Sequence, residues 1–272
     1  MLASDRWMSH SMLSAPMNFD LLDPLKCVSA TDDAYRAGHA PLASVERYIR
    51  QIIGWRDYTW HVYWHFGEAY RDRNKLMAKA PLPHWFSELD ADAVAARCLH
   101  DVLADVRDHG WVHRVPRLMV LGNYALQRGW QPPAVADWFH RCFVDGYDWV
   151  MIAYVIGMSQ HADGGSMATK PYAAGGAYID RMSDYCGQCR YRPRIRVGGD
   201  ACPFTAGYWV FLHRNRDRLA ANHRMAQPLA GMRRLRDLDE VVAQQRRHSG
   251  DPRDRSFGFV ARAAHRGTDV RI

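Results

Sequence analysis

The feature that most constrains this chain is a pair of closely spaced cysteines in the stretch Tyr185-Cys186-Gly187-Gln188-Cys189. A C-x-x-C turn places two sulfurs close enough to bind one metal centre, and the glycine lets the backbone turn tightly. Cys202 follows after a basic loop and can supply a third thiolate. A fourth thiolate would come from a distant part of the sequence, and the candidates are Cys27, Cys98 and Cys142. A merely buried or reactive pair is the simpler alternative, but the third cysteine favours zinc or an iron–sulfur cluster.

Composition narrows the class of protein. A chain of 272 residues can bury a sizeable core in one large domain or two small ones. Its net charge of +7 favours a polyanionic partner such as DNA. Six cysteines in a chain of this length do not resemble a secreted disulfide scaffold, so we expect a reducing, cytoplasmic location. No apolar run approaches the ~20 residues that cross a membrane, and the first residues lack the apolar core of a secretory signal.

The apolar pattern predicts a mainly α-helical fold, because strand-like alternation and a βαβ rhythm are both missing. We expect helices over residues 25–37, 42–64, 90–108, 118–127, 134–143, 149–156 and 206–221. They form one helical domain over residues 1–230. The segment 231–272 is dense in arginine and is expected to be a basic, solvated and partly disordered tail, with a DNA-contacting arm as the alternative.

Several stretches, taken in order, resemble the photolyase/cryptochrome family over residues 7–230. Ser11-Met12-Leu13-Ser14, with Asn18, is similar to the family's loop around the flavin phosphates. The stretch from Arg50 to Tyr58, which contains Gln51, Trp55 and Arg56, resembles the helix that lines the flavin cavity. Three further stretches resemble the remaining walls of that cavity. They are Arg117 to Asn123, Val144-Asp145-Gly146 and Gly157 to Gln160.

The stretch around Cys186 is similar to the bacterial iron–sulfur branch of this family, which includes six-four photolyases. In that branch a fourth cysteine precedes the C-x-x-C by a long helical interval, and the resemblance therefore nominates Cys98. It implies a [4Fe-4S] cluster held by Cys98, Cys186, Cys189 and Cys202. Cys27 and Cys142 are then ordinary buried thiols.

The resemblance also implies an all-helical domain that holds FAD without a covalent bond. Its expected activity is light-driven repair of UV pyrimidine dimers in DNA, most often of the six-four type, which is carbon–carbon lyase chemistry. The implied cofactor-binding residues are Ser11, Met12, Leu13, Ser14, Asn18, Gln51, Trp55, Arg56, Tyr58, Arg117, Asn123 and Asp145. The implied catalytic residues are His113, Tyr172, Tyr178 and Trp138.

Each of those four residues carries a distinct expectation. His113 matches the first histidine of a pair that passes a proton to the lesion, and Arg114 stands where the second would be. Tyr172 and Tyr178 match tyrosines at the lesion pocket. Trp138 matches a tryptophan that relays electrons to the flavin.

Two other readings of the sequence stay open. One is a cryptochrome-like photoreceptor that binds FAD without repairing DNA, and the other is a truncated, inactive fragment or a zinc-bound DNA-binding module. Family members normally begin with an α/β antenna domain, which we expect to be absent here or to belong to a longer natural chain. The expected partner is damaged DNA, with no membrane, and the expected state is a monomer.

Overall fold

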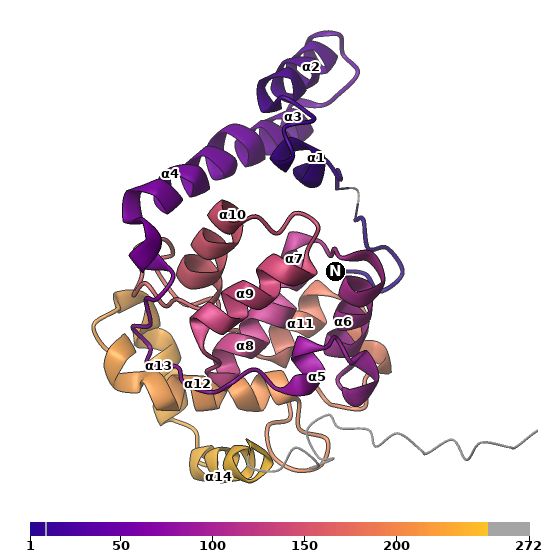
Figure 1. Cartoon of the computed structure of the whole chain (residues 1–272). Helices are drawn as coiled ribbons and strands as arrows, with labels where there is room; N and C mark the ends of the chain where they lie inside the picture. The colour runs from indigo at the N-terminus through magenta and orange to yellow at the C-terminus, as the bar shows by residue number, and fades with distance from the viewer. Residues whose placement is uncertain (9, 250–272) are drawn as a thin grey trace, which may run out of the picture.

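The computed structural model describes residues 1–8 and 10–249, with side chains up to residue 246. Within these residues the secondary structure is helical, and pairing between extended segments is limited to two isolated bridges, Ala80 with Trp130 and Arg192 with Ala201. The predicted all-α class is therefore confirmed (Figure 1). The α-helices are α1 (Ser14–Asn18), α2 (Pro24–Arg36), α3 (Leu42–Ile49), α4 (Asp57–Phe66), α5 (His84–Ser87), α6 (Arg97–His109), α7 (Arg114–Pro116), α8 (Asn123–Arg128), α9 (Pro132–Cys142), α10 (Asp148–Ile152), α11 (Gly176–Met182), α12 (Pro203–Leu219), α13 (Ala226–Arg233) and α14 (Leu238–Ser249).

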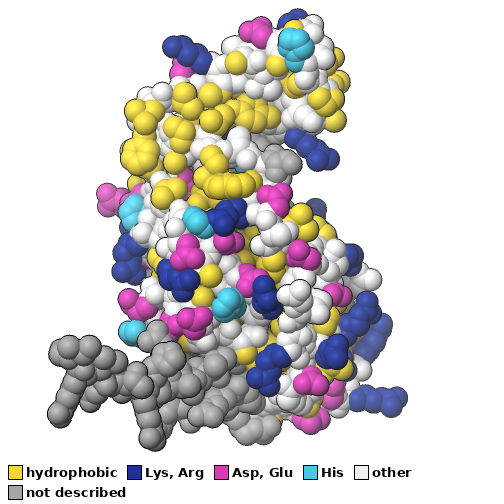
Figure 2. Space-filling view, turned by 90° about the vertical axis from the view of Figure 1, so that its right-hand side faces the viewer, with side chains coloured by type: hydrophobic (Ala, Val, Ile, Leu, Met, Phe, Trp, Pro, Cys, Tyr) yellow, Lys and Arg dark blue, Asp and Glu magenta, His cyan; other side chains and the backbone are white. Residues whose placement is uncertain are grey.

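The first four helices form an extension that we call the arm, which lies over one end of a helical body (Figure 1). The pair α2 and α3 at its tip buries little: α2 has no buried residue and α3 buries only Val45. The arm rejoins the body through α4, which packs against α10. Figure 2 shows hydrophobic side chains gathered on this upper lobe, whose exposed residues include Phe19, Leu21, Leu25 and Leu42.

The body is built around a large aromatic core. Trp138 on α9 is fully buried, and its ring lies 4.3 Å from Phe86 and 5.0 Å from Phe139, measured between centroids. Its indole N–H donates to the Phe86 carbonyl oxygen at 3.0 Å, so the one polar atom of the side chain is satisfied. A second, smaller cluster joins α12 to α13 through residues such as Phe211, Leu219 and Met232.

Three stretches of wide helical turn interrupt the regular helices: η1 (Arg50–Arg56), η4 (Arg117–Gly122) and η5 (Ala153–Ser159). Such π-type turns are rare and are frequent at functional sites, because the extra residue redirects side chains. Each falls in or next to a stretch that resembles a wall of the flavin cavity. Local propensity gives no signal for them: the sequence pattern predicted continuous helix over most of these residues and ended it at residue 156, inside η5.

Most expected helices are present, but the start of the helix expected over residues 90–108 was wrong. Residues 91–93 form a short 3₁₀ turn, η3 (Ala91–Ala93), and Val94 is extended before α6 begins at Arg97. Ala91, Ala93, Val94 and Ala96 are all buried, whereas Asp92 between them is exposed. Burial has overridden local helix propensity here.

The segment expected to be a partly disordered tail begins with packed helices. α13 spans residue 230, and α14 packs against α12 with Val241 fully buried. The basic tail predicted from residue 231 therefore does not begin as a separate, loose segment. Packed helices continue as far as residue 249. Residues 250–272 lie outside the described part of the chain. None of the described helices is long and apolar enough to cross a membrane.

Gly146 gives a direct test of this packing. A Cβ there would lie 2.6 Å from the His140 carbonyl oxygen and 2.7 Å from that of Phe143, both backbone atoms that cannot rotate away. We expect Gly146→Ala to lower the free energy of unfolding by about 1–3 kcal/mol, because overpacking strains a close-packed core. Urea denaturation measures this change.

The matched control is Gly231→Ala in α13, where the nearest atom to a new Cβ is on Trp209 at 3.9 Å. This change should leave stability unchanged or raise it by up to ~1 kcal/mol, because alanine favours helix. Equal effects of the two substitutions would contradict the packing described here.

Candidate functional site

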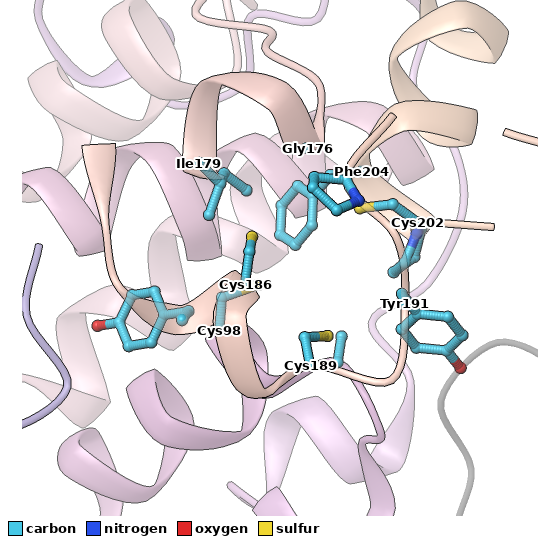
Figure 3. Close-up of a pocket in the computed structure, with 12 residues that line it drawn as sticks. Cys98, Gly176, Ile179, Cys186, Cys189, Tyr191, Cys202 and Phe204 are labelled. Atoms are coloured by element: carbon cyan, nitrogen blue, oxygen red, sulfur yellow. The ribbon is translucent and has the colours of Figure 1, made fainter. Parts of the chain in front are cut away.

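Four of the six cysteines line one small pocket in the body (Figure 3). Cys98 comes from the first turn of α6, Cys186 from η6 (Tyr185–Gln188), Cys189 from the residue after η6, and Cys202 from the residue before α12. All four are free thiols, as are Cys27 and Cys142 outside the pocket. The rest of the lining is mostly apolar and includes Ile179, Tyr191 and Phe204. The structure thus brings together the four cysteines that the sequence nominated.

Backbone hydrogen bonds hold the cysteine segments in place. The Cys189 N–H donates to the Cys186 carbonyl oxygen at 3.2 Å, which closes the C-x-x-C turn. The Cys202 N–H donates to the Ile195 carbonyl oxygen at 2.9 Å, and the Gly176 N–H donates to Thr205 Oγ1 at 2.8 Å. A Cβ at Gly176 would lie 2.6 Å from Cys202 Sγ, so only glycine lets α11 approach the sulfur this closely.

The pocket strongly disfavours thiolates unless a cation compensates them. Burial raises the pKa of Cys186 to about 12, with the neighbouring Cys202 adding to the effect. Burial also raises the pKa of Cys98 well above its ordinary value, and the other three thiols raise it further. Within residues 1–8 and 10–249, no group of three His, Cys, Asp or Glu side chains is arranged to hold a single metal ion.

A second set of predicted residues meets where the arm joins the body. Asp145, in the loop before α10, accepts hydrogen bonds from Ser14 Oγ on α1 at 3.0 Å and from Arg117 Nη1 on η4 at 3.0 Å. Arg117 also donates to the Val112 carbonyl oxygen and lies over the Phe143 ring at 4.1 Å. The Arg117–Asp145 ion pair is largely buried within the body, and its carboxylate also binds Ser14 of the arm, so it fixes the geometry of this junction.

Arg56 contacts both the arm and the body. Its guanidinium donates to Asn18 Oδ1 at 2.6 Å and lies 4.7 Å from the centre of the Trp149 ring. Burial lowers the pKa of Arg56, although arginine stays charged at neutral pH. Gln51 Oε1 accepts from Arg114 Nη1 at 2.5 Å, so Arg114 is directed toward η1.

The other predicted cofactor-binding residues differ in their burial and in the contacts they make. Trp55 contacts Tyr58 edge to face, and both are partly exposed. Ser11 and Met12 are exposed, and Leu13 is half-buried just before α1. Asn123 is fully buried, and both polar atoms of its amide bond Ala174, with the Nδ2 donating to the Ala174 carbonyl oxygen at 2.8 Å. Asn123 therefore fixes the loop that carries Tyr172 against α8.

Two residues at this junction gave no sequence signal. Tyr154 on η5 contacts Trp55, and burial raises its pKa to about 12 even though Arg114 and Arg117 lower it. His10 packs edge to face on His113, with ring centres 4.7 Å apart. Only the π-type turn and the return of the N-terminal segment bring them here, and neither is readable from local sequence.

His113 caps α7, with its Nδ1 accepting the Val115 N–H at 3.2 Å. The neutral ring then carries its hydrogen on Nε2. Burial, followed by His10, Arg114 and Arg117, lowers the pKa of His113 to about 4. Protonating the ring would require breaking the Val115 contact. His113 is therefore a neutral hydrogen-bond donor at neutral pH.

The remaining predicted catalytic residues lie in different surroundings. Tyr172 is half-buried in the loop before α11, and Tyr178 on α11 packs against the main core, with Arg181 5.7 Å from its ring centre. Trp138 belongs to the aromatic core, and its neighbour Phe139 stacks on Phe143.

Comparison with known proteins bears on these sites. No family model matches the sequence. The chain is 46% identical over 237 residues to a (6-4) photolyase of Agrobacterium fabrum, an alignment that covers 86% of this chain and 46% of that protein. A stretch of 53 residues, 20% of this chain, is 45% identical to the uncharacterized protein R855 of Acanthamoeba polyphaga mimivirus, 43% of which is covered.

This identity over most of the chain defines its class: the chain belongs to the photolyase/cryptochrome family. The relative that covers most of it is of the six-four type, and the family implies FAD as cofactor. The chain spans less than half the length of each of these curated relatives.

The lowered pKa of His113 predicts a pH dependence of stability. The unfolded imidazole binds a proton near pH 6.5, whereas the folded one does so only near pH 4. The unfolded state therefore binds more protons in this window, and the stability contributed by neutral His113 is lost as pH falls from about 6.5 toward 4. We expect the free energy of unfolding, measured in urea at several pH values, to fall less steeply with decreasing pH for His113→Gln than for the parent protein.

His39→Gln, in the exposed turn after α2, is the matched control and should decline like the parent. NMR titration checks the same point directly. A His113 imidazole that titrates near pH 6.5 in the folded protein would contradict the arrangement.

Proposed function

We propose that this protein is a light-driven, FAD-dependent DNA photolyase-like enzyme that repairs UV pyrimidine dimers, most directly those of the six-four type. The observation that carries the proposal is the 46% identity to a (6-4) photolyase along 237 residues. Because the matched region is less than half of that relative, the activity is proposed for this chain and does not follow from the match alone.

The junction between arm and body suits FAD. Among the described residues, the buried Nε of Arg117 has no hydrogen-bond partner, so this cationic side chain keeps a donor available for an anionic or carbonyl group. Arg56 supplies a second guanidinium nearby, and Ser14 a hydroxyl. Two arginines and a hydroxyl are the chemistry that a pyrophosphate and its ribityl chain require. The residues that we propose to hold FAD are those implied by the family resemblance.

The cysteine pocket offers a donor set for a metal centre. Four thiols with mostly apolar surroundings form a donor set that zinc and an iron–sulfur cluster both use. The resemblance to the iron–sulfur branch favours the cluster, and we assign Cys98, Cys186, Cys189 and Cys202 to a [4Fe-4S] cluster with a structural role first.

When bound, reduced FAD supplies one electron to the lesion under blue light and recovers it after the lesion rearranges. The residues of the chain have to hold the lesion, exclude water and control protons. His113 offers a hydrogen on Nε2 to an oxygen or nitrogen of the lesion without becoming charged. Tyr172 and Tyr178 offer rings and hydroxyls close to α11. The basic surface would bind the phosphates of damaged DNA.

One observation favours a second candidate, a photoreceptor that binds FAD without repair. Arg114 follows His113, and its side chain pairs with Gln51 on the arm. An arginine cannot exchange a proton near neutral pH, so position 114 does not supply the second imidazole that the family resemblance implies. The Arg114–Gln51 contact could instead couple the site to the position of the arm.

Metal analysis tests the cluster. Protein purified without air should contain about four irons per chain with acid-labile sulfide. Cys186→Ser should lose iron, because serine replaces a thiolate ligand, whereas Cys142→Ser, a half-buried thiol outside the pocket, should keep it. Zinc in place of iron, or equal iron in both variants, would overturn the assignment.

Repair of a synthetic six-four lesion separates the two candidates. Under blue light, flavin-loaded and reduced protein should restore the pyrimidines, and His113→Ala should lose most of this activity while keeping flavin. Protein that holds flavin but restores no lesion of the six-four or cyclobutane type would favour the photoreceptor.

A further inference from the structure

A cleft bounded by α8, α12 and α14 gathers positive charge away from the sites described above. Its volume is about 750 Å³, and it is open to solvent. α14 lies at the end of the body opposite the arm (Figure 1). Among the described residues, the lining includes none of those that we propose for FAD or for the cluster. Its charged and titratable lining residues are Arg128, His213, Arg214, Arg216, Asp217 and Arg246.

Helix packing brings these side chains together from three segments. His213, Arg214 and Asp217 lie within one turn of α12, so the spacing places them on one side of that helix. α8 and α14 both pack against α12, which adds Arg128 and Arg246 to the same cleft. The concentration of charge is therefore a product of the fold and not of one basic run in the sequence.

The positive charge in the cleft is poorly compensated. Four arginines line it, and its one carboxylate, Asp217, pairs with Arg216 at 3.4 Å in an exposed ion pair. Within the described part of the chain, no carboxylate pairs with Arg214. Desolvation, followed by the charges of Arg128 and Arg218, lowers the pKa of Arg214 to about 10, although the side chain keeps its proton at neutral pH. An anion in the cleft would relieve this repulsion.

A purely structural role explains only part of this arrangement. Arg214 Nη2 donates to the Leu126 carbonyl oxygen at 3.2 Å, near the C-terminus of α8, where a cation is favourable. One cation is sufficient for that contact, whereas four arginines converge on the cleft. A guanidinium carries five N–H donors in a planar fork. The Leu126 contact therefore leaves Arg214 with donors that can bind an oxyanion.

We propose that this cleft binds a compact ligand with two or more phosphate groups, such as a nucleoside diphosphate. Arginine binds phosphate oxygens through paired N–H···O bonds, so several arginines suit a diphosphate. The volume of the cleft lies within the range of about 300–1,000 Å³ that is typical of small-molecule sites. Val210 and Val242 add apolar surface for the rest of the ligand. This inference does not depend on flavin binding or on repair.

Isothermal titration calorimetry of the full chain with pyrophosphate and with ADP, at low salt, tests the site. We expect saturable binding of one ligand per chain. Arg214→Gln and Arg246→Gln should each weaken it about 10-fold or more, because each removes a charge-assisted contact. Arg233→Gln is the matched control: it removes the same charge from an exposed position in the last turn of α13, outside the cleft, and should bind like the parent.

The exposed Arg246 keeps the test valid if Arg214→Gln disturbs the end of α8. Binding of pyrophosphate alone supports the diphosphate site, and tighter binding of ADP supports a nucleotide as the source of the phosphates. Absence of saturable binding, or equal weakening by all three substitutions, would refute the site, since diffuse surface charge then accounts for the result. So would a DNA duplex that needs Arg214 and Arg246 while pyrophosphate does not bind, because the cleft would then contact DNA phosphates. Failure to bind flavin or to repair a lesion bears on the proposed function and leaves this readout unchanged.

Discussion

Four thiols from three separate segments face one apolar pocket, and burial raises the pKa of Cys98, Cys186 and Cys202. Backbone hydrogen bonds shape the turns at Cys189 and Cys202, and Gly176 closely approaches the Cys202 sulfur. A cationic centre in this pocket would offset the cost of ionising these buried thiols. The relative positions of three segments of the body would then depend on a single bound group. The apolar side chains around the pocket add little electrostatic attraction of their own.

The arm and the body meet through a different kind of contact. Beside ring contacts such as that of Trp60 with Trp149, polar links reach across: Ser14 donates to Asp145, and Arg114 donates to Gln51. Such links are directional, so they fix geometry more than they add stability. The π-type turns η1, η4 and η5 lie in or beside the same walls, where the extra residue in each turn changes which side chains face the junction.

The sequence predicted more of this molecule than periodicity alone could. Apolar spacing was sufficient for α2, α9 and α12, whose boundaries lie within a few residues of those expected. It failed at Ala91 to Ala96, where four of the six residues are buried, and it ended the domain before α14, whose Val241 is fully buried against the body. The order of motifs nominated Cys98 as the fourth thiol beside Cys186, and the fold brings the two to one pocket.

Other parts of the candidate site could not be predicted, because they depend on contacts between distant segments. His10 reaches His113 only after the N-terminal segment returns to the body, and Tyr154 is turned toward Arg117 by a π-type turn. The neutral state of His113 also follows from the Val115 N–H and from burial, neither of which a sequence motif records.

The slight burial of the tip of the arm has a thermodynamic consequence. α2 buries no residue and α3 only Val45, so α2 and α3 can separate from the rest at low cost without opening the core. A ligand held between arm and body binds only when both are in place, and its binding free energy adds to the stability of the closed arrangement. Protease sensitivity of the α2–α3 turn would then report cofactor occupancy, even though that turn contacts no cofactor.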